Sequence, residues 1–161
     1  QSLNNPYTGA AAIFCSAIKN DTPPLIYEDG NQRRDFIHVR DLVRGKLLLL
    51  DHPDANDDIF NIGTGKPSSI LDLAETLIEL CGKNFSPDII YKFRNGDIRD
   101  CYADISKIKA LGFAPELSLR EGLKDLIAWS DSQEAVSRVG DAHQKLVEKG
   151  LVLETQPVTS K

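Results

Sequence analysis

Apolar residues recur at helical spacing in several segments of the chain, most clearly over residues 68–82. One face of that segment carries Ile70, Leu73, Leu77 and Leu80. Ser69 and Asp72 have the spacing of a capping box, and Gly82 follows as a C-cap residue, so the pattern predicts a helix. The same spacing predicts helices over residues 5–20, 40–53, 104–113 and 118–133, and a weaker one over 134–149.

Short apolar runs bounded by turn residues predict strands between these helices. Residues 23–39, PPLIYEDGNQRRDFIHV, predict two strands around an Asp29-Gly30 turn, which is a hairpin signal. Residues 58–62 predict a strand that runs into a glycine loop, and residues 87–93 predict another strand. Alternating strands and helices are typical of an α/β domain. Residues 151–161 are expected to form a disordered tail.

Composition narrows the class of protein. A length of 161 residues suits a single domain, and a net charge of −5 argues against general nucleic-acid binding, which requires a basic surface. Apolar runs such as residues 47–50 are too short for a membrane span. The three cysteines form no CxxC pair, so free thiols in a reducing, cytoplasmic compartment are expected. Because the sequence contains no methionine, we expect a piece of a longer protein.

The histidines and the glycine loop give weak signals. His38, His52 and His143 lack metal-ligand spacing, and no G-x-S-x-G nucleophile motif is present. The glycine loop within residues 61–69, NIGTGKPSS, could cradle a phosphate with its amides. It matches neither the P-loop nor the G-x-G-x-x-G pattern, so a tight turn before a capped helix is the simpler interpretation.

A segment rich in arginine is a stronger candidate for anion binding. Arg94 and Arg99 flank a Gly96-Asp97 turn after an apolar strand, and α/β folds bind ligands beyond their strand ends. Arginine suits bidentate phosphate recognition, and Asp97 could accept hydrogen bonds from ribose hydroxyls. The alternative is a surface network of these charged residues with Asp100.

A second arginine pair, Arg33 and Arg34, follows the predicted turn. Successive side chains of a strand point to opposite faces. We therefore expect Arg33 to lie in solvent and Arg34 to point into a cleft.

Five blocks of the sequence resemble, in order and spacing, the C-terminal half of the extended short-chain dehydrogenase/reductases, the NAD-dependent nucleotide-sugar epimerase/dehydratase family. The blocks are NPYTG, PPLIYEDGNQRRDFIHVRDL, FNIGTG, GDIRDCYADISKIKALGF and SLREGL. The resemblance implies a Rossmann-type α/β fold in which residues 1–130 are the nucleotide-sugar-binding region and 131–150 a C-terminal helix. Within the family, the chain is most similar to 4-epimerases that act on UDP-glucose or on dTDP-6-deoxyhexoses.

The resemblance also implies substrate-binding roles for eight residues and a catalytic role for none. The implied set is Leu25 and Tyr27 against the base, Arg34, Asn61 and Arg94 at the diphosphate, Asp97 at the ribose, and Arg99 and Tyr102 in neighbouring roles. The expected small-molecule partner is a UDP- or dTDP-hexose.

Two features of the family are missing from the 161 residues, the G-x-x-G-x-x-G dinucleotide fingerprint and the catalytic Tyr-x-x-x-Lys. The family's chemistry is hydride transfer with NAD, with that tyrosine as acid and base. The resemblance therefore implies a parent enzyme that uses NAD, and a chain that alone is inactive and binds no NAD tightly. In the parent fold residues 58–62 would join the missing half of the sheet, so an exposed strand edge is expected. The chain alone is then expected to self-associate or to be only marginally stable.

Other functions stay open at the level of the sequence. A nucleotide-sugar 4,6-dehydratase or reductase of the same family would share the same blocks. Outside the enzymes, the arginines could serve a non-catalytic nucleotide-binding module, or they could form a protein-interaction face together with the 134–149 helix.

Overall fold

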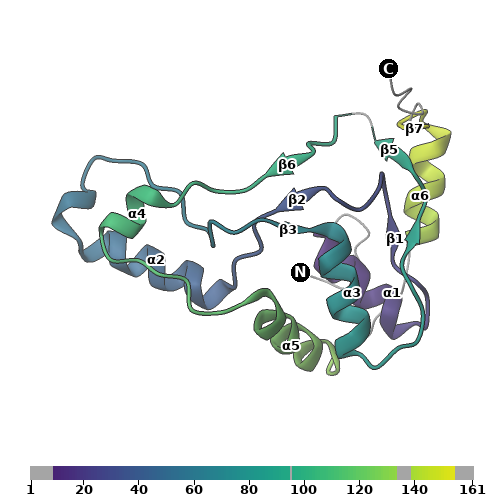
Figure 1. The fold of residues 1–161 in the computed structure, drawn as a ribbon, viewed down its shortest axis with the longest axis horizontal. Helices are drawn as coiled ribbons and strands as arrows, with labels where there is room; N and C mark the ends of the chain where they lie inside the picture. Colours follow the sequence, from purple (N-terminus) through teal and green to yellow (C-terminus); the bar gives the residue numbers. More distant parts are fainter. Residues whose placement is uncertain (1–8, 95, 134–138, 155–161) are drawn as a thin grey trace, which may run out of the picture.

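The computed structural model describes residues 9–94, 96–133 and 139–154. Helices and short strands are interspersed along the chain, which confirms the predicted α/β class (Figure 1). The helices are α1 (Ala10–Lys19), α2 (Val39–Asp51), α3 (Ile70–Leu80), α4 (Ser106–Ala110), α5 (Leu119–Ser130) and α6 (Val139–Glu148), with a 3-10 turn at Pro53–Ala55. The strands are β1 (Leu25–Ile26), β2 (Arg33–Arg34), β3 (Ser68–Ser69), β4 (Asp88–Ile89), β5 (Lys92–Arg94), β6 (Asp100–Cys101) and β7 (Val152–Glu154).

The predicted capping boxes begin two of the helices. In α3 the Ser69 hydroxyl accepts from the Asp72 amide at 2.9 Å, and the Asp72 carboxylate accepts from the Ser69 amide at 3.0 Å. Ser118 and Glu121 form the same reciprocal pair at the start of α5. Such caps satisfy amide groups that a helix start leaves without partners, which is why these helix starts could be predicted.

The predicted hairpin around Asp29-Gly30 is wrong. Strand β1 pairs in parallel with β4, whereas β2 pairs antiparallel with β3 and in parallel with β6. The turn instead packs against the start of α3, where the Gly30 carbonyl accepts from the Leu71 amide at 2.9 Å. A Cβ on Gly30 would lie 3.1 Å from the Leu71 Cβ, and its φ of +81° favours glycine.

Two further strand predictions differ from the structure. Residues 58–62 form no strand. In this segment Lys107 Nζ donates to the Ile59 carbonyl at 3.0 Å and Asn61 Nδ2 donates to the Asp104 carbonyl at 3.3 Å. The predicted strand over 87–93 is divided into β4 and β5 at Tyr91, whose φ is +53°.

The expected disordered tail is also wrong in its first part. Val152–Glu154 form β7, which pairs antiparallel with β5 so that Val152 lies opposite Arg94. This strand follows α6 and fastens it beside β5 and β1 (Figure 1). The rest of the expected tail, residues 155–161, lies outside the described residues, as do residues 134–138 of the predicted last helix.

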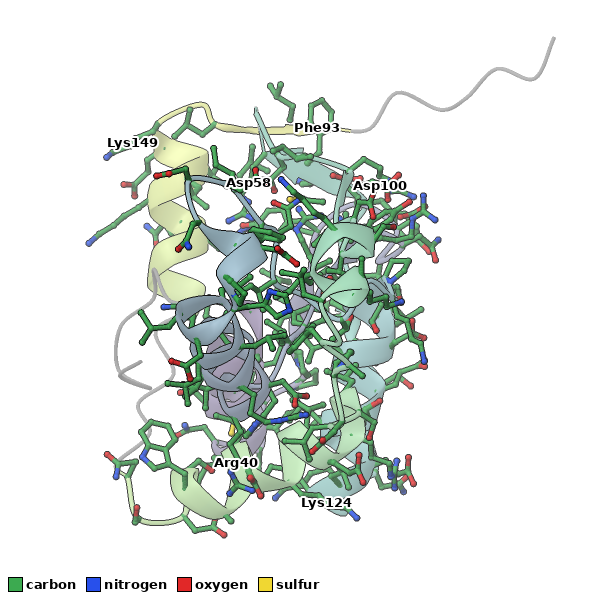
Figure 2. All side chains as sticks on the ribbon, turned by 90° about the vertical axis from the view of Figure 1, so that its left-hand side faces the viewer. Arg40, Asp58, Phe93, Asp100, Lys124 and Lys149 are labelled. Carbon is green, nitrogen blue, oxygen red and sulfur yellow. The ribbon has the colours of Figure 1, made fainter. Side chains whose placement is uncertain are left out.

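Two hydrophobic cores hold the elements together. The larger one joins α1, α3, α5 and β1 through buried residues such as Ile18, Ile26, Leu77 and Leu123. The smaller one, Ile105, Ile108 and Phe113, packs against α2 and the segment around Ile62. Figure 2 labels Arg40 and Lys124 where α2 meets α5, and Phe93 and Lys149 at the opposite end of the molecule near β7 and α6.

One face of α2 remains exposed and apolar. Val39, Val43, Leu47 and Leu50 recur at helical spacing and are each between 47% and 78% exposed. All three cysteines are free thiols, as predicted. In the part of the chain that the structure describes, no helix is long and apolar enough to cross a bilayer.

Candidate functional site

A cavity of about 530 Å³ lies between α1, β1, β2, β5 and α6. Its apolar wall includes Ile13, Phe14, Leu25, Ile26, Phe36, Ile70 and Leu146, and its polar side chains are Tyr27, Gln32, Arg34, Asp35, Arg94, Asp97 and His143. In Figure 1 α1, β1, β5 and α6 gather at the right-hand end of the molecule, and β2 lies toward its middle. A cavity with an apolar wall and a few convergent polar groups is typical of a small-molecule site.

Arg34 is held in the cavity wall by main-chain carbonyl groups. Its guanidinium donates to the carbonyls of Arg33, Ile98 and Arg99 at 2.8, 2.6 and 3.1 Å. These bonds fix the side chain without neutralising its charge. Since a guanidinium has five N–H donors, Arg34 can still donate to an anion in the cavity.

Arg33 lies outside the cavity, as the alternation of the strand predicts. It forms a bidentate ion pair with Asp100, with Nε–Oδ1 at 2.7 Å and Nη2–Oδ2 at 3.0 Å. The two neighbouring arginines therefore differ in environment: one is neutralised by a carboxylate, and the other lines the cavity.

Tyr27 is the centre of a polar cluster at one end of the cavity. The Arg94 guanidinium lies over its ring at 5.0 Å, and Arg94 Nε donates to Asp97 Oδ2 at 2.8 Å. On another side, the Tyr27 hydroxyl lies 2.7 Å from His143 Nδ1. Burial raises the pKa of Tyr27, an effect that Arg94 opposes and Asp97 adds to, so the phenol is protonated at neutral pH.

The glycine loop before β3 does not offer its amides to the cavity. The Asp35 carboxylate accepts from the amides of Thr64 and Gly65 at 2.8 and 3.0 Å and from the Thr64 hydroxyl at 2.7 Å. A Cβ on Gly63 would lie 2.4 Å from Asp35 Oδ2, so glycine is required for this close approach. The loop is therefore a tight turn before a capped helix and not a phosphate-binding loop. The Asp35 carboxylate occupies the N–H and O–H donors that could hold a phosphate.

Of the eight residues implied as substrate contacts, the structure brings five into one cavity. These are Leu25, Tyr27, Arg34, Arg94 and Asp97, drawn from segments about 60 residues apart in sequence.

The other three, Asn61, Arg99 and Tyr102, are not among the residues that line it. Arg99 donates to Asp29 at 2.7 and 2.8 Å, and these two bonds hold the pKa of Asp29 well below its usual range. Arg99 also donates to Glu28 at 2.6 Å. Tyr102 lies beneath the Arg33 guanidinium at 5.4 Å. Asn61 is bonded to Asp104, so ligand contacts for these three residues stay predictions.

Three polar residues of the cavity, Gln32, Asp35 and His143, were missed from the sequence. Gln32 is 6% exposed, and His143 reaches Tyr27 across 116 positions of the chain. Gln32 had no motif to mark it, and His143 lay in the weakest predicted helix. Among the described residues, no group of three His, Cys, Asp or Glu side chains is placed to hold a metal ion.

Comparison with known proteins gives this cavity a family context. The family model described as the NAD dependent epimerase/dehydratase family matches residues 4–63. The dTDP-L-rhamnose 4-epimerase of Burkholderia thailandensis is 35% identical over 130 residues, which are 80% of this chain and 36% of that protein.

Solved structures agree with this match. The UDP-glucose 4-epimerase of Thermotoga maritima, solved with UDP-glucose, superimposes with a TM-score of 0.71 at 34% identity, over 80% of this chain and 41% of that one. The UDP-glucuronic acid 4-epimerase of Bacillus cereus, solved with NAD, gives a TM-score of 0.65 at 28% identity, over 80% and 41%. This chain thus spans about two fifths of the length of the solved relatives. The matches in sequence and in fold together place the chain in the NAD-dependent epimerase/dehydratase family.

Proposed function

We propose that this chain binds the nucleotide diphosphate of a nucleotide sugar, as the substrate-binding part of a NAD-dependent 4-epimerase of a UDP- or dTDP-hexose. The observation that carries the proposal is the joint position of Arg34 and Arg94 in the wall of one cavity, beside Tyr27 and Asp97. Two arginines can take the charge of a diphosphate, the Tyr27 ring and the Leu25 side chain provide apolar surface for a base, and Asp97 can accept from a ribose.

The relatives support the choice of reaction. The three relatives described above are 4-epimerases, and two of them were solved with UDP-glucose and with NAD, respectively. A 4,6-dehydratase or a reductase of the same family, or a non-catalytic nucleotide-binding module, would use the same diphosphate cavity. The enzymes differ in the reaction that they carry out at the sugar, and a non-catalytic module would carry out none.

We propose NAD as the cofactor of the whole enzyme, and we do not propose that it binds in the cavity of this chain. When bound, NAD supplies the hydride acceptor and donor for the sugar. The glycine loop of this chain does not fit its diphosphate, because Asp35 takes the amides of Thr64 and Gly65. We therefore assign no step of the reaction to these residues and expect this chain alone to be inactive.

Calorimetric titration with UDP, dTDP and UMP tests the proposal. UDP and dTDP are expected to bind with similar affinity. UMP is expected to bind at least about tenfold more weakly, since the second phosphate makes charge-assisted hydrogen bonds. An affinity for UDP no higher than that for UMP, or no binding of UDP, would contradict a diphosphate site.

Self-association of the isolated chain stays a prediction, but the surface proposed for it is no longer the strand edge expected from the sequence. Residues 58–62 form no strand edge, whereas α2 carries an exposed apolar face of Val39, Val43, Leu47 and Leu50. We propose a cytoplasmic protein whose isolated chain associates through this surface. Sedimentation velocity over a concentration series tests the association, and a monomer at all concentrations would contradict it.

A further inference from the structure

The Arg94 guanidinium is held over the ring of Tyr27. Its Cζ lies 5.0 Å from the ring centre, and its Nε donates to Asp97 Oδ2 at 2.8 Å. These contacts leave the terminal nitrogens, Nη1 and Nη2, able to donate to an anion in the cavity that all three residues line. The Arg94 side chain is 45% exposed, and an arginine has many rotamers to choose from. The direction of its guanidinium therefore depends on where the Tyr27 ring lies.

The Tyr27 ring is itself held by α6. Its hydroxyl is hydrogen-bonded to His143 Nδ1 at 2.7 Å, and the two ring centres lie 5.8 Å apart with a tilt of 49°. Tyr27 follows β1 directly, so this bond joins segments that are 116 positions apart in the sequence. Leu146, about one helical turn after His143, lines the same cavity. Helix α6 thus fixes the aromatic ring that supports Arg94.

The main chain of Arg94 is bonded to the same C-terminal segment. Strand β7 pairs antiparallel with β5, with Val152 opposite Arg94. In Figure 1 α6 and β7 lie together beside β5. The pairing holds the backbone of Arg94, and the bond between His143 and Tyr27 supports its side chain.

This C-terminal segment lies outside the part of the chain that resembles the family. The five sequence blocks of the resemblance end at Leu123, whereas α6 begins at Val139. Arg34 lies within those blocks, and its guanidinium is held by carbonyl groups of β2 and of the segment before β6. The two arginines of the cavity are therefore positioned by different parts of the chain.

We propose that His143 is a positioning residue that orients Arg94 through the Tyr27 hydroxyl, so that α6 and β7 complete the anion site. The inference rests on the proposed function, because it takes the anion to be a diphosphate. An ordered guanidinium loses less entropy when it binds, so its positioning contributes to affinity. The contribution of His143 to diphosphate binding is expected to act through Arg94 and not through Arg34.

UDP binding by variants of the full chain, measured by calorimetry, tests the hydrogen bond. His143→Phe keeps a ring but removes the partner of the Tyr27 hydroxyl, and it is expected to weaken UDP binding by about fivefold. Tyr27→Phe removes the other half of the same bond and is expected to give the same loss. The double variant is expected to be no weaker than either single one. Wild-type affinity in His143→Phe would overturn the proposal.

Two arginine backgrounds show where the effect acts. In Arg34→Ala, the added His143→Phe substitution is expected to weaken UDP binding by the same factor as in the wild-type chain, because Arg94 is still present. In Arg94→Ala it is expected to cause a further loss of less than about 1.5-fold, because the guanidinium that it orients is gone. A merely structural role of His143 would give equal losses in both backgrounds, and that result would overturn the proposal.

A measurement without ligand separates this proposal from the proposed function. The ring current of Tyr27 shifts the NMR signals of the Arg94 side chain, and this shift is expected to fall in His143→Phe. Gln144, exposed on the same helix and bonded to Glu148 at 3.0 Å, is the control, and Gln144→Ala is expected to leave the shift unchanged. An unchanged shift in His143→Phe would overturn the positioning role. A reduced shift in a chain that does not bind UDP would support the positioning of Arg94 and contradict the diphosphate site.

Discussion

Replacing Arg34 or Arg94 with alanine is expected to weaken UDP binding by about 10- to 100-fold in each case. The reason is that each guanidinium is proposed to make charge-assisted hydrogen bonds to the diphosphate, which contribute about 1.5–3 kcal/mol. Arg34 is fixed in the cavity wall by three main-chain carbonyl groups, so little side-chain entropy remains to be lost on binding. Calorimetric titration of each variant with UDP measures the loss.

Arg33 supplies the matched control for these variants. It is the neighbour of Arg34 on β2, yet it is paired with Asp100 outside the cavity. Arg33→Ala is expected to change UDP affinity by less than about twofold, because a neutralised surface arginine exerts little field on a distant anion. Unchanged affinity in both Arg34→Ala and Arg94→Ala would show that the diphosphate is not bound there.

A large loss of stability is expected when the buried carboxylate of Asp41 is replaced by asparagine. Asp41 is 1% exposed; its Oδ2 accepts from the amides of Glu116 and Leu117 at 3.0 and 2.9 Å, and its Oδ1 from Arg44 at 2.7 Å. An amide can satisfy only some of these donors and turns an NH₂ group toward the others. We expect Asp41→Asn to lower the free energy of unfolding at pH 7 by about 3 kcal/mol.

The dependence on pH follows from the environment of Asp41. Burial alone would raise its pKa, but the hydrogen bonds from Leu117, Glu116 and Arg44 outweigh burial, and the pKa lies below its ordinary value. A carboxyl whose pKa is lower in the folded state stabilises the fold above the pKa of the unfolded chain, about 3.9. That stability is lost as the pH falls through the folded-state pKa.

Urea unfolding of the wild-type chain and of Asp41→Asn at several pH values measures how much stability the charge of Asp41 contributes. The difference in the free energy of unfolding between wild type and Asp41→Asn is expected to be largest near pH 7 and to shrink below about pH 4. Asp51→Asn, at the exposed end of the same helix, is the control and is expected to change stability by less than about 0.5 kcal/mol. An equal difference in the free energy of unfolding at pH 7 and pH 3 would contradict a stabilising role of the Asp41 charge.

The helices and the core of the candidate site could be predicted because their signals are local. Capping boxes and apolar stripes marked α3 and α5 from within a few residues. The placement of Arg34 and Arg33 on opposite sides followed from strand alternation alone. The resemblance then named five side chains that do line one cavity.

What could not be predicted depends on contacts between distant segments. Nothing near Arg99 indicates that it pairs with Glu28 and Asp29, about 70 residues earlier. The strands are only two or three residues long, so periodicity could not show that β1 pairs with β4 instead of with β2. His143 enters the site because β7 returns to β5, in a segment whose composition suggested a tail.

The most direct test of the nucleotide-sugar cavity is a titration of the isotope-labelled chain with UDP-glucose, followed through its backbone amide chemical shifts. We predict that the largest changes fall in residues 25–36, at Arg94 and Asp97, and in residues 143–146, which meet at the cavity. Saturating changes confined to the glycine loop at residues 63–66, or none at all, would contradict the account.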